Sequence, residues 1–200
     1  MKRKSKGRIR RFFVSNYRTL AFLALPLAGC LFGSLLYGAV RESAWLRLLP
    51  IGDVPRTFGA ICSAFWSSCF QPLLLLAVLF IAGLSACGVP VALATPVFWG
   101  VGLGLTLAYY YAGGLAGVGV TAAVLLPHSV MEAVALMMGA AEYFQMSVRF
   151  AAVLLPHSAH CGGLWQPFRL YAMRFLLLAL LLFGAAALDV GMRLLCAGWL

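Results

Sequence analysis

His128 and Glu132 are the two residues whose types and spacing are best suited to chemistry. They lie four positions apart just after Pro127, so on a helix both side chains share one face. An ionised carboxylate in hydrocarbon is costly, and a neighbouring imidazole would share its proton, as in ion pathways and proton relays. In the structural alternative, the two side chains hydrogen-bond each other and a neighbouring helix around a kink at Pro127. We favour assembly over ion coupling, and ion coupling over catalysis.

A second pair of charged residues, Asp189 and Arg193, has the same four-residue spacing near the end of the chain. An ion pair on one helical face lowers the cost of burying either group. We therefore expect this pair to be structural.

A metal site would have to combine residues from two copies of the segment Ala-Val-Leu-Leu-Pro-His-Ser, at 123–129 and 152–158. Its candidate ligands would be His128, Glu132, His157, His160 and Cys161. The copies fall in different contexts, one in a predicted span and one in a predicted loop, and no single helix carries three ligands. The six cysteines form no Cys-x-x-Cys pair. We expect no metal, no cofactor and no disulfide framework.

Glycine pairs at four-residue spacing, Gly100 with Gly104 and Gly113 with Gly117, resemble a phosphate-binding loop only superficially. No Lys-Ser or Lys-Thr follows them. In hydrocarbon, small residues at this spacing let helix backbones approach closely. We interpret these glycines, together with Pro127, as helix-packing residues.

The elements that must position these residues are membrane helices. The sequence is 64% hydrophobic and only 10% charged, with a mean hydropathy of +0.98, and it holds no Asp, Glu, Lys or Arg between Thr57 and Met131. Such a chain has too little polar surface to coat a soluble globule of its length. Its apolar runs lack the alternation of an outer-membrane barrel. The predicted fold is an all-α, polytopic transmembrane bundle.

We predict about five spans in a single transmembrane domain, residues 17–200, preceded by a basic cytoplasmic N-terminus, residues 1–16. Spans of about twenty apolar residues suffice to cross a bilayer. A polar, irregular segment containing Arg149 is expected between the last two spans. The predicted spans are about 17–40, 65–87, 92–112, 116–140 and 172–195.

The net charge of +10 is concentrated at the N-terminus and predicts the orientation of the chain. With this topology, eleven Lys and Arg residues lie on the cytoplasmic side and four outside, out of the fifteen in the sequence. The positive-inside rule then places the N-terminus inside and the C-terminus outside. The basic segment interacts with anionic membrane lipids, so the charge does not call for a nucleic-acid partner.

The order of these features resembles the stage II sporulation protein M family of spore-forming bacteria. The similar segments include a basic N-terminus, the pair Phe65-Trp66 at the entry to a long uncharged hairpin, and the glycine-rich stretch 99–104. They continue with Leu125-Leu126-Pro127-His128-Ser129-Val130-Met131-Glu132, which resembles the family's Leu-Pro-His-Gly and acidic motif with Ser129 in place of glycine. The resemblance implies a multi-pass protein of the bacterial cell membrane. It also implies a scaffold for membrane-anchored cell-wall hydrolases that remodel peptidoglycan during engulfment of the forespore.

Two functional hypotheses follow from the sequence. The first is a non-enzymatic scaffold or anchor whose spans and outer loop bind partner membrane proteins, with possible homo-oligomerisation. The second is a transport protein, either a small permease or the membrane subunit of an ABC-type transporter, with His128 and Glu132 along the path. We expect no enzymatic activity, because no nucleophile and base are paired in the sequence.

Overall fold

The computed structural model describes residues 17–40, 57–85, 89–154 and 165–196. Nearly all of these residues are helical and none lies in a strand, which confirms the predicted all-α fold class. The basic segment 1–16 and the residues His157, His160 and Cys161 lie outside the described ranges. The helices are α2 (Tyr17–Val40), α3 (Phe58–Ala82), α4 (Val89–Ala112), α5 (Leu115–Val120), the π-helical turn η2 (Thr121–Leu125), α6 (Leu126–Leu154) and α7 (Trp165–Leu195).

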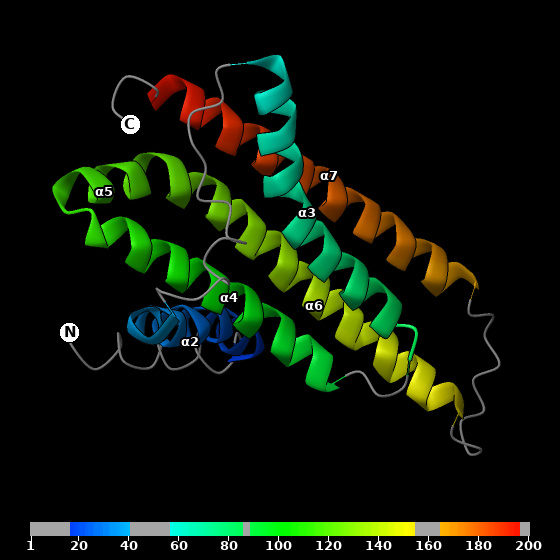
Figure 1. The fold of residues 1–200 in the computed structure, drawn as a ribbon. Coiled ribbons are helices and arrows are strands. Elements are labelled where there is room, and N and C mark those ends of the chain that lie inside the picture. The colour runs from blue at the N-terminus through cyan, green and yellow to red at the C-terminus, as the bar shows by residue number, and fades with distance from the viewer. Residues whose placement is uncertain (1–16, 41–56, 86–88, 155–164, 197–200) are drawn as a thin grey trace, which may run out of the picture.

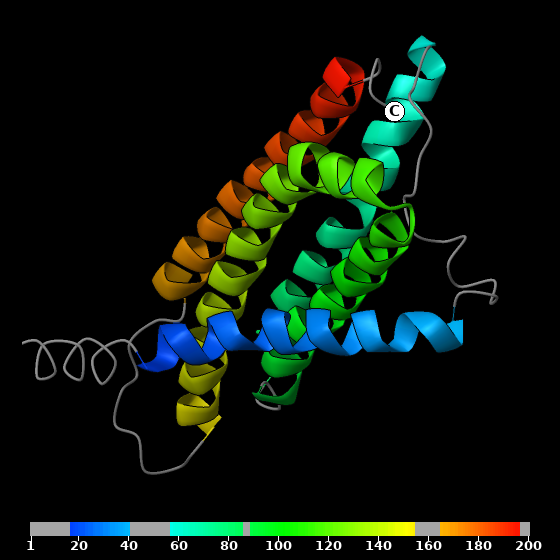
Figure 2. The same ribbon diagram turned by 90° about the vertical axis from the view of Figure 1, so that its left-hand side faces the viewer.

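The long helices α3, α4, α6 and α7 form an up-and-down bundle (Figures 1 and 2). Helix α6 packs beside α7, α3 lies against both, and α4 closes the bundle against α6. Leu79, Leu136, Leu182 and Tyr143 are fully or almost fully buried at its centre. One end of the bundle holds the C-termini of α3 and α6, and the other holds the C-termini of α4 and α7 (Figure 1).

Four helical stretches are long and apolar enough to cross a membrane: Phe58–Ala82, Pro90–Ala112, Gly117–Phe150 and Trp165–Leu195. The apolar part of α2, Ala24–Val40, is shorter. Large apolar side chains such as Leu35 on α2 and Leu177 on α7 are exposed. Surfaces of this kind suit hydrocarbon, so these helices make the chain an integral membrane protein.

Helix α2 crosses α4 obliquely at the side of the bundle, as Figure 2 shows. The contact depends on glycines, because a Cβ atom on Gly100 or Gly104 would overlap the Pro26 or Cys30 carbonyl of α2. Likewise, a Cβ atom on Gly29 or Gly33 of α2 would overlap a backbone carbonyl of α4. Two backbones can approach this closely only where side chains are absent.

A hydrogen bond adds to this helix pair. The Ser34 hydroxyl lies 3.2 Å from the Gly104 carbonyl of α4 and 2.9 Å from the Cys30 carbonyl of its own helix. Serine commonly links transmembrane helices in this way.

The helix after the second glycine pair is much longer than predicted. We expected a span at 116–140 followed by an irregular segment, but α5, η2 and α6 run from Leu115 to Leu154, and Arg149 is helical. The sequence from 141 to 154 contains neither glycine nor proline, so nothing in it interrupts the backbone hydrogen bonds. Arg149, which we expected in a loop, lies in the last turns of α6 instead.

Tyr171 joins α7 to the end of α3. Its hydroxyl lies 3.0 Å from the Phe80 carbonyl and 3.2 Å from the Leu79 carbonyl, and its ring stacks on Phe80 with centroids 5.2 Å apart. The Leu79 carbonyl also accepts a hydrogen bond from the Gly83 N–H, but carbonyls in the last turn of a helix generally lack intrahelical partners, and an unpaired carbonyl is costly in hydrocarbon. Tyr171 supplies such a partner from a neighbouring helix.

Candidate functional site

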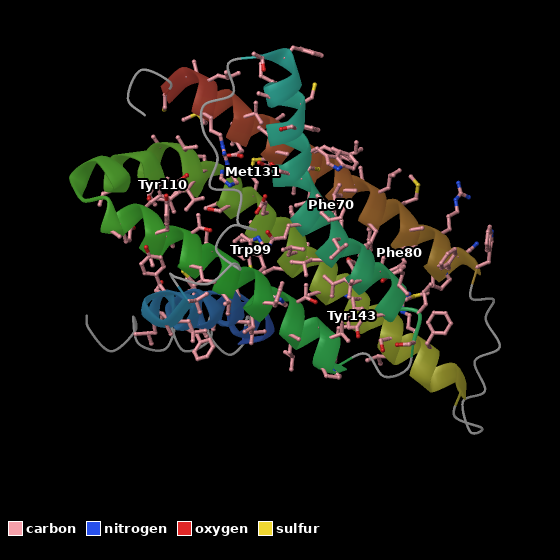
Figure 3. The ribbon with its side chains drawn as sticks, in the orientation of Figure 1. Phe70, Phe80, Trp99, Tyr110, Met131 and Tyr143 are labelled. Atoms are coloured by element: carbon pink, nitrogen blue, oxygen red, sulfur yellow. The ribbon has the colours of Figure 1, made fainter. Side chains whose placement is uncertain are left out.

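A polar cavity of about 70 Å³ lies between α3, α4, α6 and α7, in the half of the bundle near the C-terminus of α7. Figure 3 shows Trp99 and Tyr110 of α4, which line it, beside α6. On the same measure one water needs about 10–15 Å³, so the space would accommodate a few. The polar side chains of its wall include Ser68, Gln71, Tyr110, His128, Ser129, Glu132, Asp189 and Arg193.

Asp189 is the centre of the polar cluster and is fully buried. Its Oδ2 accepts a hydrogen bond from Ser68 Oγ at 2.6 Å and lies 2.9 Å from Arg193 Nη2. Its Oδ1 accepts from Arg193 Nε at 3.1 Å. The bidentate arginine contact and the short serine bond are the geometry of an ionised carboxylate. This cluster ties α3 to α7.

His128 connects α6 to the same carboxylate. Its Nδ1 lies 2.9 Å from the Val124 carbonyl and 3.4 Å from Asp189 Oδ1. Both neighbours are hydrogen-bond acceptors, so we assign the hydrogen to Nδ1, which donates to the Val124 carbonyl. The imidazole therefore faces Asp189 with a donor, and protonation of Nε2 would strengthen their attraction.

Glu132 is buried on the same face of α6, but its partner comes from α4. The Trp99 indole Nε1 donates a hydrogen bond to Glu132 Oε2 at 3.1 Å. Trp99 is itself buried. Because an indole can donate but not accept, this contact suits a carboxyl oxygen with a free lone pair.

The π-helical turn η2 leads directly into the segment that carries His128 and Glu132. Pro127 has no backbone N–H to donate to the preceding turn, and a locally widened turn is one way a helix accommodates this loss. Val124, whose carbonyl receives His128, belongs to that turn. The proline thus helps to position the histidine.

The predicted site residues fall into two groups. His128 and Glu132 line the same cavity, although each has its own partner, Asp189 or Trp99, and the structure records no hydrogen bond between the two. Gly113, at the turn between α4 and α5, and Gly117, within α5, lie apart from the cavity cluster, and a Cβ on Gly117 would overlap the Tyr110 carbonyl of α4.

Several residues of the cluster were not predicted as part of one site, namely Ser68, Gln71, Trp99 and Tyr110. The expected ion pair of Asp189 and Arg193 is present, but it belongs to the His128 cluster instead of standing alone. The available signal was the rarity of an acidic residue within an apolar helix, which marks Asp189 as a residue in need of a partner. Within the described ranges, every buried side-chain nitrogen and oxygen has a hydrogen-bond partner.

No group of three His, Cys, Asp or Glu side chains in the described part of the chain could hold a metal ion. Glu132 and Asp189 interact with donors from the protein itself, which are serine, tryptophan, arginine and histidine.

Comparison of the chain with protein-family models, with curated proteins and with solved structures finds no match. The fold and the cavity together define the class of protein. The chain is an integral membrane protein, a helical bundle with a buried cluster of charged and polar side chains.

Proposed function

We propose that the protein is a non-enzymatic membrane scaffold that holds partner membrane proteins on a fixed helical framework. The observation that carries this proposal is that the buried polar groups of the described bundle already have partners within the chain. Asp189 already accepts hydrogen bonds from serine and arginine, so displacing these donors in order to bind another group would cost free energy. Such a cluster is suited to holding α3, α6 and α7 in one arrangement.

The resemblance described above suggests the chemistry of the partners. They would be membrane-anchored cell-wall hydrolases, and the protein would act in the bacterial cell membrane during sporulation. A framework of this kind needs one stable arrangement of its spans, and buried polar contacts can specify such an arrangement.

Co-purification in mild detergent tests the scaffold. Tagged full-length protein should retain at least one membrane-anchored hydrolase in near-stoichiometric amount, as measured by quantitative mass spectrometry. The Ser68→Ala variant, which removes a donor from the buried cluster, should retain less, whereas Ser67→Ala should match the wild type. Ser67 is a fair control because, among the described residues, its hydroxyl bonds only to the Ala64 carbonyl of its own helix. Recovery of the chain alone would contradict the proposal.

Transport is a second candidate, and the cavity favours it. Two carboxyl groups, Glu132 and Asp189, face a single guanidinium there, so the site has the composition to attract a proton or a small cation. In this case the protein would be a small permease or the membrane subunit of an ABC-type transporter, and His128 would be placed to relay a proton.

The Glu132→Gln variant distinguishes the two candidates. A proton transporter reconstituted in vesicles with a pH-sensitive dye should lose flux in this variant while still assembling, whereas a scaffold should show no flux and keep its partners. Glu142→Gln is the matched control, because Glu142 lies on the same helix but outside the cavity. Equal flux through both variants and the wild type would exclude a role for Glu132 in transport.

A further inference from the structure

A second polar groove lies between α6 and α7 at the end of the bundle opposite the cavity. It measures about 120 Å³. Its wall includes Glu142, Gln145 and Arg149 from α6, and Leu170 and Arg174 from α7. Arg149 belongs to the part of α6 that we had expected to be a loop, so this groove exists only because the helix continues.

Two arginines, Arg149 and Arg174, and one glutamate, Glu142, line the groove. The Arg174 guanidinium donates from Nη1 to both Glu142 oxygens, at 2.5 and 2.6 Å. Arg149 is exposed, and among the described residues no side chain forms a hydrogen bond or ion pair with it. One positive charge is thus left over beside an amide, Gln145, that can donate two further hydrogen bonds.

Apolar side chains surround these charges. Leu170 lines the groove and is largely exposed, and exposed Val148 and Met173 are the sequence neighbours of Arg149 and Arg174. The groove therefore combines a cationic centre with an apolar rim near the ends of two membrane-spanning helices. Basic pockets between transmembrane helices on the cytoplasmic side are suited to lipid headgroups.

We propose that this groove binds the phosphate of an anionic phospholipid, with Arg149 as its main contact and Arg174 as a second. The exposed rim would contact the acyl chains, which a free phosphate does not have. Glu142 competes with the phosphate for Arg174, so it limits the affinity of the groove. This inference does not depend on whether the bundle acts as a scaffold or as a transporter.

The test uses full-length protein in phosphatidylcholine vesicles with spin-labelled phosphatidylglycerol, in which the motionally restricted lipid is measured by electron paramagnetic resonance. An arginine near the membrane surface contributes about 1 kcal/mol to anionic lipid binding. Arg149→Gln should therefore weaken association of the labelled lipid about fivefold. Arg169→Gln is the matched control, because it removes the same charge from an exposed residue that does not line the groove.

The Glu142→Gln variant should have the opposite effect on lipid binding. It frees Arg174 from Glu142, so association of the labelled lipid should become stronger. Two results would overturn the proposal: equal weakening by Arg149→Gln and Arg169→Gln, which indicates surface charge alone, or complete displacement of the labelled lipid by millimolar inorganic phosphate, which indicates a free-phosphate site. Circular dichroism of each variant verifies that it folds. Among the described residues, Arg149 forms no hydrogen bond or ion pair that its loss would break.

Discussion

The bond between Ser68 and Asp189 allows a sharp test of the buried cluster. The Ser68→Ala change removes one hydroxyl that donates to a fully buried carboxylate over 2.6 Å and leaves the remaining donors in place. Hydrogen bonds to charged groups contribute about 1.5–3 kcal/mol in proteins generally. Interhelical bonds in membranes average only about 0.6 kcal/mol and reach about 1.7, because the unfolded chain also finds partners.

We expect the free energy of unfolding to fall by about 1.5 kcal/mol in Ser68→Ala, near the upper end of the membrane range. The bond is short and charge-assisted, which places it above the average. The assay is equilibrium unfolding in mild detergent by titration with sodium dodecyl sulfate, followed by far-ultraviolet circular dichroism. Ser67→Ala should change the free energy by less than about 0.5 kcal/mol, since its hydroxyl bonds within α3. Equal effects of the two variants would refute an ionised, serine-bonded Asp189.

Three other predictions can be tested by the same unfolding titration. Gly104→Ala should destabilise the protein, because its Cβ overlaps an α2 carbonyl, whereas Gly38→Ala, in open space, should stabilise it by about 0.5–1 kcal/mol; effects of the same sign would contradict the tight α2–α4 contact. Tyr171→Phe should cost about 1 kcal/mol by leaving an α3 carbonyl unpaired, and an unchanged midpoint would show that the carbonyl finds another donor. Asp189→Asn should cost about 3 kcal/mol or more, and adding Arg193→Met should recover part of this loss; a purely additive double variant would argue against their pairing.

The limits of sequence interpretation appear most clearly in α6. The sequence predicted a polar, irregular segment containing Arg149, yet Arg149 lies on the helix together with Glu142 and Gln145. They tolerate this position because they line a groove at the end of the bundle, where Glu142 pairs with Arg174. Composition places a residue near water, but it does not say whether the backbone there is helical.

The sequence predicted only one side of the tight contact between α2 and α4. Spacing identified Gly100 and Gly104 as small residues on one face, but it did not identify Gly29 and Gly33 as the positions opposite them. A glycine pair is a local pattern, whereas its partner depends on which helix lies alongside and in which register. Several helices in this chain carry small residues, so the sequence left the pairing undecided.

The sequence by itself determined the apolar helices, the absence of charge from Thr57 to Met131, and the shared face of His128 and Glu132. These properties follow from composition and from the helical repeat, which are local. Only the tertiary structure decided that Ser68 reaches Asp189, 121 positions away, and that Trp99 reaches Glu132, 33 positions away. The physical reason is that the rotation of each helix about its axis is set by packing against its neighbours, which no local period specifies.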